Sequence, residues 1–170
     1  ITRVDSICTI YDIENKKIVR SFTPNPPATM MIEFTPDEKG YMYQDNNSIL
    51  IKNIETDALI MQIPYKEEAE SAAMFSDMNR VLIGSRDGQI DLYDAEKKQS
   101  TIIKTKPGPK AGWFPVLQIM IAPDQKHFCT VTRFQWGNDS KEMGEKLKKE
   151  RPDLYSRWLR YGIALWDSQT

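Results

Sequence analysis

The chain has 170 residues and a formal net charge of −1, with 28% of its residues charged. The length fits one domain, and the balanced charge argues against nucleic-acid binding by the domain as a whole. The longest apolar runs are strand-length pieces such as residues 119–122, whereas a membrane span needs about 18 apolar residues. Composition therefore indicates a globular domain without a membrane-spanning segment.

Three stretches of the sequence follow one pattern. Asp12, Asn53 and Asp94 are separated by equal intervals (53 − 12 = 41 and 94 − 53 = 41). Apolar residues stand two and four places before each of them, a spacing that puts them on one face of a strand. These residues are Cys8, Ile10, Ile49, Ile51, Ile90 and Leu92. A fourth copy ends at Trp166 and Asp167, with Ile163 and Leu165 as its apolar residues.

Residues 1–22 begin part-way through such a unit. Residues 7–13 alternate between apolar and polar side chains, which predicts a half-buried strand. A polar turn at 14–17 leads to a second strand that begins at Ile18, so the sequence predicts two strands here. Pro24, Pro26 and Pro27 then interrupt the ladder, because proline lacks the N–H group that a strand must donate.

Two units of four predicted strands follow. The strands of the first unit are 30–34, 41–44, 48–54 and 58–63, and those of the second are 72–75, 81–85, 89–94 and 101–103. Asp87-Gly88 is the clearest hairpin signal in the chain, because this pair readily adopts positive φ. We expect Ile51 and Leu92 to occupy equivalent buried positions.

The last unit departs from the pattern. Residues 116–121 and 127–134 match the inner and second strands, but Asp167 follows Asp94 by 73 residues (167 − 94 = 73), a surplus of 32 (73 − 41 = 32). The surplus lies largely between Phe134 and Tyr161. It predicts helix, because residues 139–142 have the spacing of a capping box and Pro152 suits the first position of a second helix.

A strand that ends in Trp-Asp or a related pair, repeated at a period near 40, resembles the WD-repeat β-propeller family in divergent form. The resemblance implies an all-β fold, a partial WD-repeat-like propeller of four-stranded antiparallel blades with a helical insertion in the third-blade hairpin. The expected boundaries are 1–22 for the end of a blade, 23–63 and 64–106 for two blades, and 107–170 for a blade that lacks its last strand. The insertion covers about 135–160. Because a closed propeller needs at least about four blades, we expect the chain to be part of a longer protein.

WD-repeat blades are commonly braced by a His, Asp, Ser or Thr, and Trp tetrad. Ser85, Asp87 and Tyr93 match three of these roles imperfectly, whereas no histidine has the required position. We therefore expect apolar packing and backbone ladders, rather than this network, to hold the blades together.

Catalytic and cofactor motifs are absent from the sequence. It contains no glycine-rich phosphate loop, no His-Glu-x-x-His and no Cys-x-x-Cys. The single histidine, His127, has no acid beside it in the sequence that would orient it for catalysis. We therefore expect a protein that is not an enzyme, with no catalytic residues, no cofactor and no metal site.

The two cysteines, Cys8 and Cys129, fall on strands of different predicted blades. Two isolated strand cysteines fit a reducing compartment better than a disulfide framework. Together with the lack of a recognisable signal peptide, they favour an intracellular, cytoplasmic protein.

The predicted partners are other protein subunits of a larger assembly, since a rigid radial stack presents loops of several blades on one face. The loop 106–115 and the insertion open on the same rim of a WD-type blade, which brings an aromatic patch together. The expected partner-binding residues are Trp113, Phe114, Trp136, Tyr155, Trp158 and Leu159. The same aromatic stripe also fits a simple pin that holds the insertion on its own propeller.

Basic residues gather in the insertion, and they support an alternative function. Lys146, Lys148, Lys149 and Arg151 would contact phosphates if the chain were the propeller arm of an RNA–protein machine. Acidic residues such as Glu145 and Glu150 interleave with them, which is also typical of a solvated helix face.

Overall fold

The computed structural model describes residues 2–4, 7–23, 31–104, 115–132, 149 and 162–167. These residues form strands β1 to β14 and the turns that join them. The chain divides into two compact units, Ile1–Ala69 and Glu70–Thr170, which are described separately. The all-β class that the sequence predicts is confirmed for the described residues. The predicted helical insertion at 135–160 lies outside them except for Lys149.

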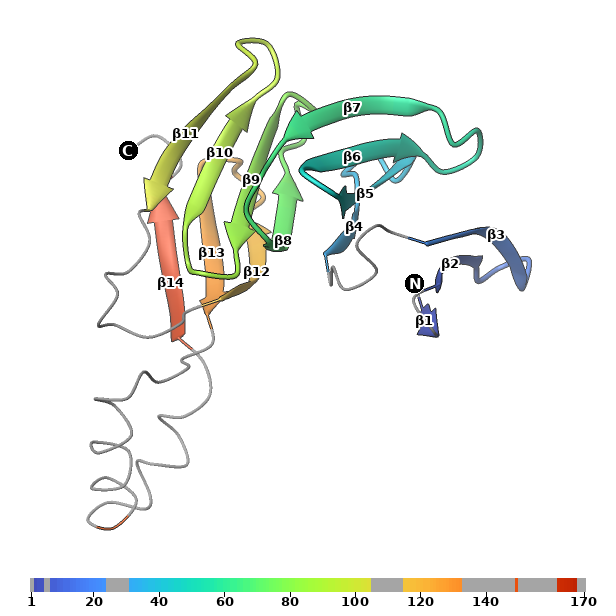
Figure 1. The fold of residues 1–170 in the computed structure, drawn as a ribbon, viewed down its shortest axis with the longest axis horizontal. Helices are drawn as coiled ribbons and strands as arrows, with labels where there is room; N and C mark the ends of the chain where they lie inside the picture. The colour runs from blue at the N-terminus through green and yellow to red at the C-terminus, as the bar shows by residue number, and fades with distance from the viewer. Residues whose placement is uncertain are drawn as a thin grey trace. The chain divides into compact units, whose positions relative to one another are not determined.

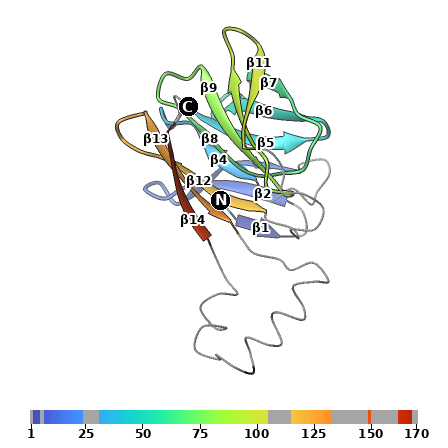
Figure 2. The same cartoon turned by 90° about the vertical axis from the view of Figure 1, so that its left-hand side faces the viewer.

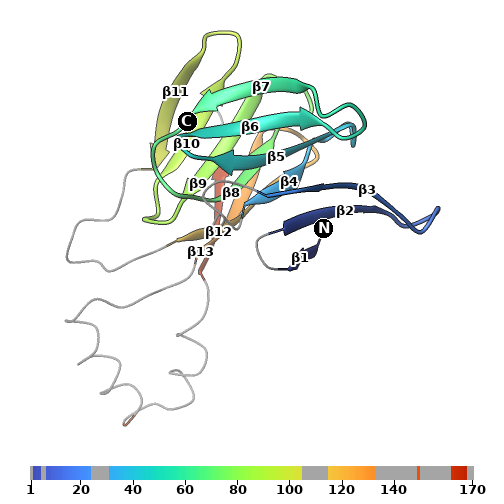
Figure 3. The same cartoon turned by 45° about the vertical axis from the view of Figure 1, so that its right-hand side comes forward.

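The first unit contains two antiparallel sheets (Figure 3). The sheet β1-β2-β3 has three strands, Thr2–Val4, Ile7–Asp12 and Lys17–Phe22. The sheet β4-β5-β6-β7 has four: Ile32–Phe34, Gly40–Asp45, Ser48–Asn53 and Leu59–Pro64. The sequence predicted two strands in the first sheet and missed β1, because three residues are too few to establish an alternation.

The second unit also contains a four-stranded and a three-stranded sheet (Figures 1 and 2). The first has the order β11-β10-β9-β8, with β8 spanning Ala69–Met74, β9 Arg80–Ser85, β10 Ile90–Asp94 and β11 Gln99–Lys104. The second has the order β12-β13-β14, with strands Val116–Ile121, His127–Thr132 and Gly162–Asp167. Strand β14 lies at the edge of its sheet, as Figure 2 shows.

The repeated Asp or Asn has the same physical role in three sheets, since it closes the turn that follows the third strand of the repeat. Its side-chain oxygen accepts a hydrogen bond from the backbone N–H of the residue three places later. Asn15 donates to Asp12 at 2.9 Å, Thr56 to Asn53 at 2.9 Å and Lys97 to Asp94 at 3.0 Å. The residue four places later has positive φ in each turn: 52° at Lys16, 62° at Asp57 and 52° at Lys98. The repeat in the sequence is therefore a repeat of turn chemistry.

A second aspartate closes the turn between the inner and second strands. Asp37, Asp77 and Asp124 each accept the N–H of the residue two places later, at 3.1, 2.9 and 2.9 Å. The residue after each aspartate has positive φ, between 58° and 61°. These backbone hydrogen bonds favour the ionised carboxylate, and they contribute to lowering the pKa of all three side chains.

Each unit has its own core between two sheets. In the first unit Phe22 of β3 lies 4.9 Å, ring centre to ring centre, from both Tyr41 and Tyr43 of β5. In the second unit Phe128 of β13 and Trp166 of β14 stack at 6.1 Å within the core. The fully buried members of that second core include Phe75, Leu82, Ile90 and Val116.

Two positions that the sequence treats as equivalent differ in burial. Ile51 is 0% exposed, as expected. Leu92 packs against the second core but is only partly buried. Its register partner on β9, Leu82, is the fully buried leucine of this sheet.

We predict that Leu82→Ala lowers the free energy of unfolding by about 2–5 kcal/mol, because it removes a fully buried side chain and leaves a cavity. Leu59→Ala is the matched control, since Leu59 is 54% exposed on a strand, and it should change stability by less than about 1 kcal/mol. Urea unfolding measures both. Equal effects of the two substitutions would contradict the assigned core.

Candidate functional site

The aromatic residues that the sequence selects for partner binding lie outside the described residues. This holds for Trp113, Phe114, Trp136, Tyr155, Trp158 and Leu159, and also for the basic residues Lys146, Lys148 and Arg151. Lys149 is described, and it is exposed. The described strands that flank these segments therefore show where each segment leaves the sheet.

Those strands fix where the two segments leave the sheet. In the β12-β13-β14 sheet Val116 pairs with Thr132, and Thr132 pairs with Gly162. The loop 105–114 ends one residue before Pro115, and the segment 133–161 runs from Thr132 to Gly162. Since neighbouring strands lie about 4.8 Å apart, the three attachment points span roughly 10 Å at one end of the sheet.

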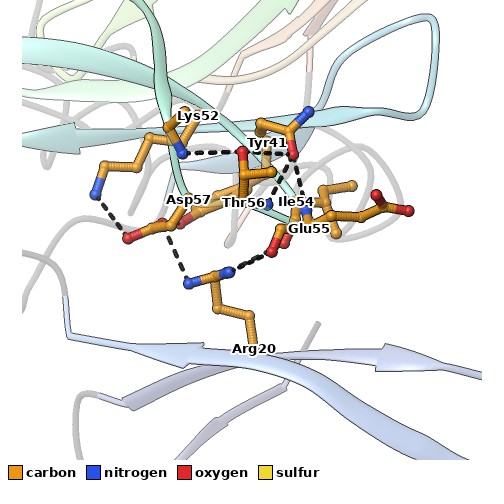
Figure 4. Close-up of polar contacts among 9 residues, drawn as sticks. Arg20, Tyr41, Lys52, Ile54, Glu55, Thr56 and Asp57 are labelled. Carbon is orange, nitrogen blue, oxygen red and sulfur yellow. Dashed lines mark hydrogen bonds and ion pairs between the residues drawn. The ribbon is translucent and has the colours of Figure 1, made fainter.

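Asp57 is joined by two ion pairs and forms a polar cluster among the described residues of the first unit (Figure 4). Asp57 lies before β7 and adopts φ 62°. Its carboxylate accepts a hydrogen bond from the Tyr41 hydroxyl at 2.8 Å and pairs with Lys52 at 3.4 Å and with Arg20 at 3.6 Å. Three strands of two sheets, β3, β5 and β6, thus converge on one carboxylate.

Arg20 links the two sheets of the first unit through the same turn. Its guanidinium donates to the carbonyl oxygens of Ile54 at 3.1 Å and Glu55 at 2.9 Å. The Tyr41 hydrogen bond lowers the pKa of Asp57 most, burial opposes it, and the nearby charges of Lys52 and Arg20 add to the lowering. Burial, followed by the bond to Asp57, raises the pKa of Tyr41. The cluster keeps Asp57 ionised and Tyr41 protonated, an arrangement that fastens two sheets together.

The described residues contain no group of three or more His, Cys, Asp and Glu side chains that is arranged to hold a metal ion. Nor does this part of the chain form a helix long and apolar enough to cross a membrane. Cys8 is buried and Cys129 partly buried, and neither is part of a disulfide bond among the described residues.

His127 has an acidic neighbour that lies three residues before it. Its Nδ1 is 2.6 Å from Asp124, whose backbone and histidine hydrogen bonds lower the pKa to about 2. Both side chains are exposed, so this pair belongs to a surface turn.

Three curated proteins of Arabidopsis thaliana resemble the chain. Topless-related protein 1 and protein TOPLESS are each 23% identical to it over 75% of its length, and Topless-related protein 2 is 26% identical over 59%. Among solved structures, hydrazine synthase of Kuenenia stuttgartiensis superposes with a TM-score of 0.56 over 75% of this chain and 36% of that one, at 14% identity. No family model matches the chain.

In its repeated antiparallel sheets and in its similarity to these relatives, the chain resembles a fragment of a divergent WD-repeat β-propeller. It spans only 9–12% of the length of the TOPLESS relatives, so it corresponds to a small part of such proteins. The resemblance to hydrazine synthase concerns the fold alone.

The WD-type tetrad is present only in fragments. The Ser85 hydroxyl donates to the Asp87 carboxylate at 2.5 Å, as the sequence suggested. Within the described residues, Tyr93 forms no hydrogen bond with Ser85. In the last sheet Trp166 Nε1 donates to Thr130 Oγ1 at 3.0 Å, a Trp-to-Thr link between the third and second strands that sequence reasoning missed. The sequence contains a signal for this link, because Trp166 is the only tryptophan among the repeated pairs.

In the first four-stranded sheet, the Gln44 side chain joins the second strand to residues that follow the fourth strand. Its side-chain nitrogen donates to the Glu67 carbonyl at 2.7 Å, and its oxygen accepts from the Ala69 N–H at 2.8 Å. The second strand is thereby tied to the segment that follows β7. The only feature of the sequence that indicates this bridge is the position of Gln44, 41 residues before Ser85 (85 − 44 = 41).

We predict that Asp57 stabilises the fold in a pH-dependent way. Because its folded pKa is below the ordinary value of 3.8, the stabilisation is fully present above about pH 5 and is lost as the pH falls through the folded pKa. Asp57→Asn, which tolerates positive φ, should lower the melting temperature near neutral pH, and the difference from the wild type should shrink in acid. Melting curves across the pH range measure it.

Tyr41→Phe tests the cause of the shift. It removes the hydrogen bond that contributes most to lowering the pKa of Asp57, so the carboxylate should titrate closer to 3.8 in an NMR titration. An unchanged titration of Asp57 in this variant would mean that the phenol does not control the carboxylate.

Proposed function

We propose that the chain is a non-catalytic scaffold, a protein–protein interaction module of a WD-repeat protein within a multiprotein assembly. The observation that carries this proposal is the common exit point of the loop 105–114 and the segment 133–161 at one end of the β12-β13-β14 sheet. Both segments are rich in large aromatic residues, which anchor interfaces because they bury much area at little entropic cost.

The proposed binding surface consists of aromatic and aliphatic side chains of these two segments. It comprises Trp113, Phe114, Trp136, Tyr155, Trp158 and Leu159. A surface of this composition favours a protein partner that offers an apolar groove or patch of its own. The intracellular location, cytoplasmic in the simplest case, belongs to the same proposal.

The similarity to the TOPLESS proteins supports a scaffold rather than an enzyme. Several charged side chains of the described residues are engaged in turns and sheet-to-sheet contacts, such as those of Asp57 and Asp94. No cofactor or metal forms part of the proposal. The competing function, phosphate contact in an RNA–protein machine through Lys146, Lys148, Lys149 and Arg151, is separated from it by experiment.

Trp158→Ala is the direct test of the proposed surface. Proteins captured by the wild-type chain are identified, one is purified, and its affinity for both forms is measured by calorimetry. We predict a loss of about 2 kcal/mol or more in binding free energy, with an unchanged melting temperature. Trp166→Ala is the contrasting variant, because Trp166 packs in the second core, and it should lower the melting temperature instead.

Two results would contradict the proposal. If Trp158→Ala lowers the melting temperature and leaves affinity unchanged, the aromatic stripe pins the insertion to its own sheets. If the wild-type chain binds single-stranded RNA with an affinity that falls steeply with salt, and reversing the charge of Lys148 reduces both affinity and salt slope, the phosphate-binding alternative holds.

A further inference from the structure

A buried serine fastens the beginning of β12 to the neighbouring sheet. Ser71 lies on β8 and is 2% exposed, and its hydroxyl donates a hydrogen bond to the Val116 carbonyl oxygen at 2.6 Å. Val116 is the first residue of β12. Both residues belong to the second unit, so this bond joins two sheets within one compact part of the chain.

Gly84 of β9 allows a close approach of the two sheets at the same place. A Cβ atom at this position would lie 2.6 Å from Cβ and Cγ1 of Val116 and 2.8 Å from the Ser71 hydroxyl oxygen. Glycine is therefore required here by the approach of a neighbouring strand, since any side chain would displace β12. Two residues earlier on the same face of β9, Leu82 packs in the second core together with Val116.

The β12-β13 ladder is irregular at this end. Val116 pairs with Thr132, whereas Gln118 pairs with Val131, so the register shifts at Leu117. A bulge of this kind interrupts the regular hydrogen bonding between two strands. The Ser71 hydroxyl thus fixes β12 from the neighbouring sheet at the place where the ladder of its own sheet is irregular.

The same end of the sheet carries the two segments of the proposed binding surface. Val116 follows the loop 105–114 by way of Pro115, and the segment 133–161 connects Thr132 to Gly162. A surface that is divided between two segments binds more tightly when their attachment points are already fixed, because freedom that is lost only on binding lowers affinity.

We propose that Ser71 and Gly84 are positioning residues for the partner-binding surface. They hold the first residue of β12 against β8 and β9, and in this way they fix the end of the sheet from which both segments leave. Neither residue offers a side chain to a partner, since Ser71 is buried and glycine has none. The inference rests on the proposed function and adds to it the residues that act from the neighbouring sheet.

Ser71→Ala tests this role against a matched control. Thr130→Ala also removes one buried hydrogen bond, the 3.0 Å bond from Trp166, but that bond lies within the β12-β13-β14 sheet and does not join it to its neighbour. Both substitutions should lower the melting temperature. Only Ser71→Ala should weaken binding of the partner purified for the Trp158→Ala experiment, by about fivefold or more in calorimetry. Thr130→Ala should keep the affinity within about twofold of the wild type.

Hydrogen exchange by NMR tests the positioning without any partner. In Ser71→Ala the amides of Val116, Thr132 and Gly162 should exchange faster than in the wild type, whereas those of Phe128 and Trp166 at the other end of the sheet should not. Gly84→Ala should have the same selective effect, because its methyl group displaces β12. If Gly84→Ala does not fold, Ser71→Ala decides the question alone.

Three results would overturn the positioning role. Exchange at the three attachment residues that is unchanged in Ser71→Ala would show that the bond does not hold this end, whatever Trp158→Ala does to binding. Equal losses of affinity in Ser71→Ala and Thr130→Ala would indicate a general effect of lowered stability. Unchanged affinity in Ser71→Ala, combined with a loss in Trp158→Ala, would mean that the surface is correct and that its positioning is not.

Discussion

Sheet-on-sheet packing is the constraint on which the rest of this structure depends. A strand alternates its side chains between two faces, so a sheet that packs on a neighbour must be apolar on the side that meets it. In the first unit Phe22 of one sheet meets Tyr41 and Tyr43 of the next. In the second unit Leu82 and Phe128 share one core. The repeat of 41 residues preserves this pattern, and the turns hold the strands in register.

The turns provide that register through carboxylates rather than glycines. Asp12, Asn53 and Asp94 close one kind of turn, and Asp37, Asp77 and Asp124 close another, and each turn contains a residue with positive φ. The described part of the chain has only one glycine with positive φ, Gly88. Side-chain oxygens that accept hydrogen bonds from the backbone therefore stabilise these turns, which in many other proteins rely on glycine.

The fold was largely predictable from sequence because the repeat appears directly in the residue types. The alternation around Ile49 and Ile51 and the recurring Asp or Asn locate the strands and their ends. The short strand β1 was not predictable, since three residues carry no periodicity. Leu92 was expected to be buried like Ile51 but is only partly so, whereas its cross-strand partner Leu82 is fully buried.

The contacts between sheets were harder to predict than the sheets. Arg20 and Asp57 are 37 residues apart (57 − 20 = 37), and nothing in either segment indicates that the two side chains meet. Thr130 and Trp166 are joined across the long segment 133–161, which hides their relation in the sequence. The aromatic residues of the proposed binding surface stay a prediction from sequence, and what supports their grouping is the shared sheet end that bears both segments.

Residue-resolved hydrogen exchange by NMR tests the central claim of repeated, mutually packed sheets most directly. Amides of β9, β10 and β13, which are paired on both sides, should exchange most slowly among the described strands of the second unit. Amides of the outer strand β11 and of the hairpin at residues 86–89 should exchange much faster. If β9 and β10 exchange as fast as that hairpin, the sheets are not the stable framework described here.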